Sequence, residues 1–169
     1  MERKYFCIGE RVSLVEYLPD ADDPLTYENW LDPVTQEAYN FQMKKTYEEY
    51  HEGESKHRWN AVILRNDDRK IIGSVTLSPE GSAPDLAINL FRTFRGLGYG
   101  TEAFSMALKY CFNNFGFTEV YAGCYEHNAA SRKMLEKCGL RPNPEGNCEE
   151  RHFLTGEPVV QFDFVKYRE

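Results

Sequence analysis

The chain has 169 residues, of which 41% are hydrophobic, and its 27 acidic and 20 basic side chains give a formal net charge of −7. This length suits a single domain, which we expect to span residues 1–169 with its folded part at about 9–167. The negative charge argues against a general nucleic-acid-binding protein, and no apolar run reaches the roughly 20 residues that cross a bilayer.

The N-terminal half of the sequence combines short extended and helical patterns. Its first 18 residues carry charges throughout and lack the apolar centre of a signal peptide, so we expect a cytoplasmic protein without a membrane partner. Apolar residues at three- and four-residue spacing predict helices, and two β-rich runs around "NDD" predict a hairpin. The expected elements are a strand at 11–18, helices at 24–31 and 35–52, and strands at 58–65 and 70–78.

The C-terminal half alternates strands and helices. We expect a strand at 85–92, a helix at 100–115, a strand at 117–124, a helix at 128–139 and a strand at 159–167. Gly116 and Gly139 stand where helices commonly end, and Asn128 stands at an N-cap position. This order predicts an α/β fold of the α+β kind, with a mixed sheet in which strands pair in parallel only near the middle.

Three glycines in five positions precede the helix at 100–115, in the sequence "FRGLGYGTEAF" at 94–104. The first backbone N–H groups of a helix lack intrahelical partners and lie at the positive end of its dipole. Glycine lets a ligand approach this backbone without a Cβ atom in the way, and Arg95 adds a positive charge. The pattern therefore predicts an anion site, although a tight turn alone would explain one or two of the glycines.

Two common nucleotide motifs fit this loop poorly. A Walker A loop requires G-x-x-x-x-G-K-[ST], which the sequence lacks, and a dinucleotide loop requires a third glycine where Thr101 stands. The strand before the loop is also preceded by five other elements, whereas a dinucleotide loop follows the first strand of its unit. A dinucleotide-dependent oxidoreductase remains a weaker alternative.

Metal and disulfide chemistry have little support in the sequence. The five cysteines form no C-x-x-C pair, the four histidines are scattered, and no H-E-x-x-H motif occurs. We expect free thiols in a reducing compartment and no metal site.

The charge is unevenly distributed along the chain. Residues 20–54 hold ten acidic side chains against two lysines, a net charge of −8, whereas residues 92–141 hold seven basic against four acidic side chains, a net charge of +3. The second region suits an anion and the first a cation, although the acidic stretch is equally compatible with a solvated helix face.

The loop and a second segment together resemble one family. "RGLGYG" fits the R/Q-x-x-G-x-G/A pyrophosphate loop of the GNAT superfamily of N-acetyltransferases, and "HNAASRKMLEKCGL" at 127–140 is similar to a second segment of that family. The resemblance covers roughly residues 9–167 and is closest to the branch of ribosomal-protein-alanine and spermidine acetyltransferases. It implies a mostly antiparallel sheet of six to seven strands, about four helices, and a central parallel strand pair that splays apart.

The resemblance implies acetyl-CoA as co-substrate. The free backbone of the strand at 85–92 would pair with the pantetheine arm, and the loop would wrap the pyrophosphate. The residues carried over by position are Leu90, Arg92, Arg95, Gly96, Leu97, Gly98, Tyr99, Gly100, Thr101 and Asn128.

The same resemblance implies direct attack of an amine on the thioester, without a cysteine nucleophile. A backbone N–H at or near Leu90 would stabilise the oxyanion. Many relatives place a tyrosine proton donor where this chain has Leu135, which leaves Ser131 as the candidate acid. Asp85 at the start of its strand is the candidate base, with Glu126 or a water chain as alternatives.

The acceptor is not written in the sequence. A protein N-terminus, a polyamine and a small amine all fit, and the acidic stretch at 20–54 favours a cationic one. A homodimer is one assembly that we allow for. The rival function is a non-catalytic module that binds acyl-CoA or a nucleotide, and Leu135 is the residue that favours it.

Overall fold

A computed structural model describes residues 1–169 and contains nine strands in two sheets. The first sheet is antiparallel, in the order β1-β2-β3-β4-β5, and the second has the order β6-β9-β7 with β8 also paired to β9. The strands of the first sheet are Tyr5–Ile8, Val12–Val15, Trp59–Arg65, Ile71–Leu77 and Leu86–Leu90. Those of the second are β6 Glu119–Tyr125, β7 Arg141–Pro142, β8 Cys148–Arg151 and β9 Pro158–Tyr167.

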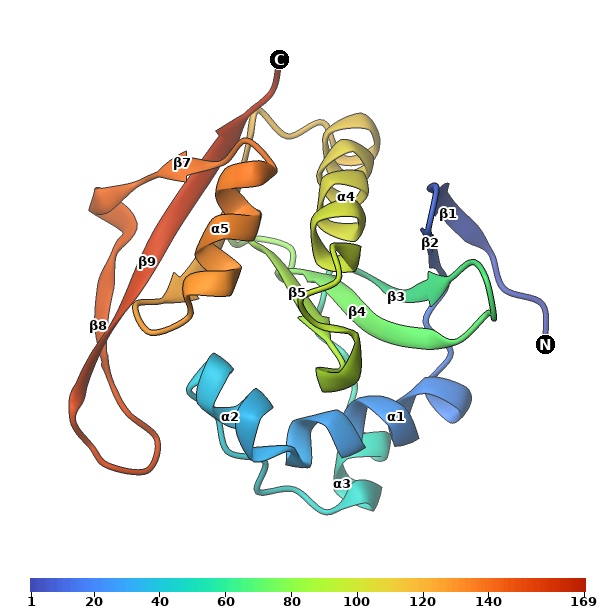
Figure 1. The fold of residues 1–169 in the computed structure, drawn as a ribbon, viewed down its shortest axis with the longest axis horizontal. Coiled ribbons are helices and arrows are strands. Elements are labelled where there is room, and N and C mark those ends of the chain that lie inside the picture. The colour runs from blue at the N-terminus through green and yellow to red at the C-terminus, as the bar shows by residue number, and fades with distance from the viewer.

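Five α-helices cover the sheets. In the view of Figure 1, α4 stands above the five-stranded sheet, α1, α2 and α3 lie below it, and α5 lies beside α4 toward the second sheet. Their bounds are α1 Pro19–Leu31, α2 Pro33–Tyr39, α3 Tyr47–Glu52, α4 Tyr99–Phe115 and α5 Ala129–Lys137. None of these helices combines the length and the apolar character needed to cross a membrane.

The single helix predicted at 35–52 is wrong, because the chain breaks it into α2 and α3. Asn40 adopts the left-handed conformation with φ 47° and ends α2, a role that asparagine shares with glycine. Thr46 then starts α3 through a capping box with Glu49, in which side chain and backbone bond reciprocally. This break raises the helix count from the expected four to five.

The expected six to seven strands are too few, because β1, β7 and β8 carry weak sequence signals. β7 has two residues, and β8 reads "CEER", with no apolar alternation. β1 and β8 lie at the ends of their sheets, where charged residues and short lengths are common because they limit pairing with other chains. Each of the three is recognisable mainly through its partner strand.

The two sheets meet at one point and then separate. Asp85 and Tyr121 form a single parallel bridge, and the Tyr121 N–H donates to the Pro84 carbonyl at 2.8 Å. No further pairing joins β5 to β6. The predicted parallel pair near the middle of the chain is therefore confirmed, and beyond Asp85 one edge of β5 has no partner strand.

The core lies between the two sheets and α4. It comprises 23 buried side chains, among them Phe104 of α4, Leu86 of β5 and Phe164 of β9. Gly116 ends α4 with φ 68°, as its position after the apolar pattern predicts. The opposite face of the first sheet carries a small apolar cluster of Val15, Val62 and Leu64, and a polar part that faces α1–α3.

Candidate active site

The glycine loop has the conformation that an anion site requires. Gly96 and Gly98 have φ angles of 75° and 86°, and Gly98 is the N-cap of α4, which begins at Tyr99. No side chain caps the first turn of this 17-residue helix. Its leading N–H groups are therefore free to bind a ligand at the positive end of the helix dipole.

Gly96 and Gly100 serve different purposes in this loop. A Cβ atom on Gly96 would meet nothing within 4 Å, so Gly96 supplies conformation rather than space. A Cβ on Gly100 would lie 3.1 Å from Leu90 Cδ1 and 3.4 Å from Met134 Sδ. Gly100 therefore keeps the surface between β5 and α5 hollow.

A cavity of about 350 Å³, the loop cavity, lies between this loop, β5, α2 and α5. Eight of the residues predicted from the sequence line it together: Leu90, Arg95, Gly96, Gly98, Gly100, Thr101, Asn128 and Ser131. The exposed side chains of Lys133 and Lys137 line it from α5. The cavity thus combines a backbone anion site with cationic side chains.

Three predicted contacts fall outside the loop cavity. Arg92 lies in a one-turn 3₁₀ helix at Arg92–Phe94, where its guanidinium is 3.5 Å from Asp32. The Leu97 side chain is 53% exposed and its carbonyl accepts from Arg11 at 2.8 Å. Tyr99 is buried with the Arg11 guanidinium 4.2 Å above its ring. Leu97 and Tyr99 can offer a ligand in this cavity only their backbone.

The free edge of β5 carries the backbone groups of Ile88 and Leu90. Asn89 and Ile88 alternate between the β4 side and the free side, as antiparallel pairing requires, and the Phe91 N–H pairs with Ile72 of β4. Tyr39 of α2 donates its hydroxyl to the Ile88 carbonyl, and Arg95 Nε donates to the Leu90 carbonyl at 2.8 Å. Ile88, rather than the predicted Arg92, is thus the second edge residue beside Leu90.

A second cavity of about 670 Å³, the sheet cavity, lies between the polar face of β3–β5 and helices α1–α3. Its floor holds neutral polar side chains in register on three strands: Asn60, Ser74, Thr76 and Asn89. Tyr39 and Ile88 line both cavities, so the two cavities meet there.

The far wall of the sheet cavity contains a connected polar group. The Asp23 carboxylate accepts from the Tyr17 hydroxyl at 2.5 Å and contacts His51 Nδ1 at 2.8 Å. Burial is the main cause that raises the pKa of Tyr17, so its hydroxyl remains a donor at neutral pH. Asp23 and Trp30 lie seven residues apart on α1, which is about 10 Å along the helix axis. The Trp30 ring packs against Tyr39 at the junction, so Asp23 lies about two helical turns away from the residue that contacts Tyr39.

The acidic stretch contributes less to this cavity than its charge suggests. Of its ten carboxylates, only Asp23 and Glu54 line the sheet cavity, where Lys45 also lies. Asp22 is buried in an ion pair with Arg3 at 2.6 Å, and Glu49 belongs to the α3 capping box. Much of the negative charge therefore stabilises helices instead of facing a ligand.

Comparison with known proteins agrees with this geometry. The family model described as "Acetyltransferase (GNAT) domain" matches residues 10–141. The chain belongs to the GNAT acetyltransferase family. It is 31% identical over 124 residues to the probable N-acetyltransferase YjcK of Bacillus subtilis (strain 168), covering 71% of this chain and 62%, less than two thirds, of that relative.

Solved GNAT structures share the fold across nearly the whole chain. A GNAT-family acetyltransferase from Bacillus anthracis matches with a TM-score of 0.79 at 18% identity, covering 97% of this chain and 98% of that one. The spermidine N-acetyltransferase of Vibrio cholerae, in complex with CoA and spermine, matches with a TM-score of 0.79 at 16% identity, covering 94% and 96%. At these identities the likeness concerns the fold.

In this GNAT domain the second motif builds the start of α5. The Asn128 side chain caps the helix by accepting from the Ser131 N–H at 3.2 Å, which confirms Asn128 as an N-cap. Both residues also line the loop cavity, and the Ser131 hydroxyl has no partner within the protein. Leu135 is 1% exposed in the core, so its position serves packing.

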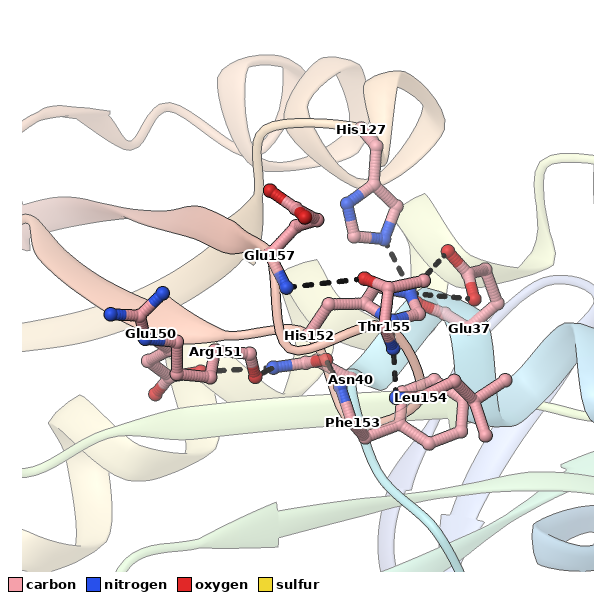
Figure 2. A network of polar contacts seen from close by, with 10 residues as sticks. All are labelled: Glu37, Asn40, His127, Glu150, Arg151, His152, Phe153, Leu154, Thr155 and Glu157. Atoms are coloured by element: carbon pink, nitrogen blue, oxygen red, sulfur yellow. Dashed lines mark hydrogen bonds and ion pairs between the residues drawn. The ribbon is translucent and has the colours of Figure 1, made fainter.

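Hydrogen bonds to two loops of the second sheet hold α2 in place. Figure 2 shows the Glu37 carboxylate held by His152 at 2.9 Å, while the Glu37 carbonyl is 2.8 Å from His127 Nε2. Asn40 accepts from the Phe153 N–H at 2.8 Å. These contacts tie α2 to the β6–α5 junction and the β8–β9 loop, and thereby position Tyr39.

The sequence analysis missed several lining residues. Tyr39 belongs to the tyrosine spacing that predicted a helix, and its spacing carried no sign that the hydroxyl reaches β5. Lys133 and Lys137 both lie in the segment at 127–140, but the sequence analysis singles out neither as a ligand contact. His57 lines the sheet cavity, and although the residue is exposed, desolvation of its ring lowers its pKa, so its imidazole is neutral at pH 7.

The structure places both predicted bases away from the cavity junction. Asp85 directly precedes β5, three positions from Ile88, and lines neither cavity. Although the residue is partly exposed, desolvation of its carboxyl and, secondarily, nearby Asp163 raise its pKa to about 6. Glu126 accepts from the Val160 N–H at 3.1 Å, which holds it to β9.

Replacing Asp85 with Asn is expected to raise the melting temperature at pH 7.5 and to leave turnover unchanged. Because the folded state binds the Asp85 proton more tightly than the unfolded state, stability is lost as the pH rises from about 4 through about 6. The gain in the variant should therefore vanish near pH 4, as measured by thermal unfolding at both pH values. A loss of kcat of about 10²-fold would instead restore Asp85 as the base.

Proposed function

We propose that this chain transfers an acetyl group from acetyl-CoA to a primary amine by direct attack in a ternary complex. The observation that supports the proposal is the meeting of two cavities at Tyr39 and Ile88, one lined by the glycine loop at the start of α4 and one with a polar floor. Each cavity has a size typical of small-molecule sites. Their junction is where the thioester and the amine would meet.

The loop cavity fits the chemistry of acetyl-CoA. The N–H groups of Gly98–Thr101 would bind the pyrophosphate, and Lys133 and Lys137 would face its charges from α5. The N–H groups of Ile88 and Leu90 on the free edge would pair with pantetheine. Gly100 supports this fit, because a side chain there would fill the space between Leu90 and Met134.

Three groups that line the two cavities or their edge have suitable chemistry for the transfer. A backbone N–H at Leu90 would stabilise the oxyanion that forms on the thioester carbonyl. The unpaired Ser131 hydroxyl would protonate the departing thiolate. Neutral His57, on the wall of the sheet cavity, would accept the proton of the amine through water.

The amine would enter through the sheet cavity. Asp23 and Glu54 on its wall would attract a positively charged acceptor, and the Vibrio cholerae neighbour that holds CoA and spermine supports an amine in this fold. The reacting amine must lose its proton before attack, because an alkylammonium has a pKa of about 10.

The alternative is a module that binds acyl-CoA without turnover, and a release assay separates the two functions. Free CoA thiol is measured after mixing the protein and acetyl-CoA with each of several primary amines. We expect thiol release that depends on the amine and yields the acetylated product by mass spectrometry. Tight CoA binding with no amine-dependent release would favour the module, and no CoA binding at all would contradict both.

A further inference from the structure

A chain of buried hydrogen bonds links the loop cavity to the sheet cavity. Arg95 Nη2 donates to Thr35 Oγ1 at 2.8 Å, and Thr35 Oγ1 donates to Asn29 Oδ1 at 3.2 Å. Asn29 Nδ2 donates to Asn89 Oδ1 at 2.9 Å. Thr35, Asn29 and Asn89 are 0%, 8% and 9% exposed, so water does not compete at these bonds.

The hydrogen bonds of this chain all run in one direction. A guanidinium can only donate, so Thr35 accepts from Arg95, and Thr35 gives its own proton to Asn29 Oδ1. Asn29 therefore presents its NH₂ group to Asn89. Asn89 in turn must use its oxygen toward Asn29, which leaves its Nδ2 donor for the sheet cavity.

The free donor of Asn89 belongs to the sheet cavity, one residue along β5 from the junction of the cavities. Asn89 follows Ile88, which lines both cavities, and consecutive Cα atoms are about 3.8 Å apart. No group of the protein accepts from Asn89 Nδ2, and the neighbouring floor residues Ser74 and Thr76 are uncharged. A ligand that occupies this position without an oxygen or nitrogen acceptor would leave a nearly buried donor unsatisfied.

We propose that Asn89 is a specificity-determining residue that selects primary amines which also carry an oxygen acceptor near the amine. Arg95, Thr35 and Asn29 are positioning residues that hold its donor toward the acceptor. The proposal rests on the proposed acetyl transfer and narrows its acceptors. A polyamine, whose amines are separated by methylene groups, does not meet this requirement, whereas an α-amino acyl group or an amino alcohol does.

Three probes of nearly equal shape test the requirement. Alaninamide carries a carbonyl oxygen beside the aminated carbon, alaninol carries a hydroxyl there, and sec-butylamine carries only carbon. We expect kcat/KM, calculated on the unprotonated amine, to be at least about tenfold higher for both oxygen-bearing probes than for sec-butylamine, the scale of an unsatisfied buried donor. If only alaninamide is favoured, the acceptor is acyl-like, and if both are favoured, a hydroxyl suffices.

Two variants should place an oxygen, instead of the Asn89 NH₂ group, toward the sheet cavity. Asn29→Asp can only accept, so Asn89 must turn its NH₂ group toward it and present an oxygen to the cavity. Asn89→Asp presents a carboxylate directly. In both, the ratio of kcat/KM for alaninamide to that for sec-butylamine should fall at least about tenfold, and comparing ratios cancels the different pKa values of the two amines.

Two substitutions of Thr35 serve as matched controls for the hydrogen-bond chain. Thr35→Val removes the hydroxyl and should lower the same ratio, whereas Thr35→Ser keeps the hydroxyl and should retain the wild-type ratio. Side-chain amide exchange by NMR checks the direction independently of turnover, with slow exchange expected for Asn29 and fast exchange for Asn89.

The outcomes separate this proposal from the proposed function. Wild-type protein that binds no acetyl-CoA, or that acetylates none of the probes, overturns the proposed transfer and this proposal with it. Transfer to sec-butylamine as fast as to alaninamide overturns this proposal alone. So does an unchanged ratio in folded Asn89→Asp protein, even if Asn29→Asp fails to fold.

Discussion

Gly98→Val is expected to weaken CoA binding by at least about 100-fold while the protein remains folded. Gly98 has a φ of 86°, a conformation that a β-branched residue adopts only at a high cost. The loop would have to change course and move the N–H groups at the start of α4. Losing two hydrogen bonds to a charged group, each about 1.5–3 kcal/mol, accounts for this factor in the dissociation constant measured by isothermal titration.

Gly81 provides the matched control for this variant. It has the same φ of 86°, and a side chain there would meet nothing within 4 Å. Gly81 lines neither cavity, so Gly81→Val should lower stability by a similar amount and leave CoA binding intact. Normal CoA binding by folded Gly98→Val protein would mean that the loop does not hold the pyrophosphate.

Ser131→Ala is expected to lower kcat by about 10²-fold with little change in CoA affinity. The factor is that of a general acid, here the hydroxyl that would protonate the CoA thiolate. Because the Asn128 cap uses the backbone N–H of Ser131, the alanine variant should keep the cap and its stability. Steady-state kinetics with acetyl-CoA and a primary amine measure the effect.

Ser131→Thr is the corresponding rescue, because it keeps a hydroxyl at the same position of α5. We expect it to recover most of the lost kcat. If Ser131→Ala turns over at the wild-type rate, Ser131 is only a helix residue, and the Tyr39 hydroxyl becomes the candidate acid. Burial raises the pKa of Tyr39 to about 12, so this hydroxyl stays protonated at neutral pH.

The anion loop could be predicted from the sequence because its determinants are local. Gly96, Gly98 and Gly100 stand within five residues, and the helix that follows them is strongly patterned. The residues that a local pattern brings together, from Arg95 to Thr101, lie where the prediction placed them around the start of α4. The same reasoning could not tell that the Leu97 and Tyr99 side chains point away from the cavity.

The sheet cavity could not be predicted because its contacts are distant along the chain. Tyr39 reaches Ile88 across 49 positions, and Asn29 reaches Asn89 across 60. The break between α2 and α3 that brings Tyr39 to β5 depends on the left-handed Asn40, and a helical apolar spacing conceals it. Periodicity reports which face of an element is apolar, and it does not report which partner that face meets.

Asp85 illustrates how a correct element can still misplace a functional group. The predicted strand at 85–92 exists, and its first residue forms the bridge to β6. The junction of the cavities lies at Ile88, three positions along β5 from Asp85, a span of about 10 Å. A side chain at the start of the strand therefore does not reach the junction directly.

The most direct test of the proposed function locates the CoA site from the shifts that CoA causes in backbone amide resonances. Titration of CoA into ¹⁵N-labelled protein should shift the amides of Ile88, Leu90 and Gly98–Thr101, which line the loop cavity or its edge. The amide of Gly81, in the turn before β5, should not move. If CoA shifts resonances elsewhere and leaves those of Gly98–Thr101 unchanged, the loop cavity is not the CoA site and the proposed function is wrong.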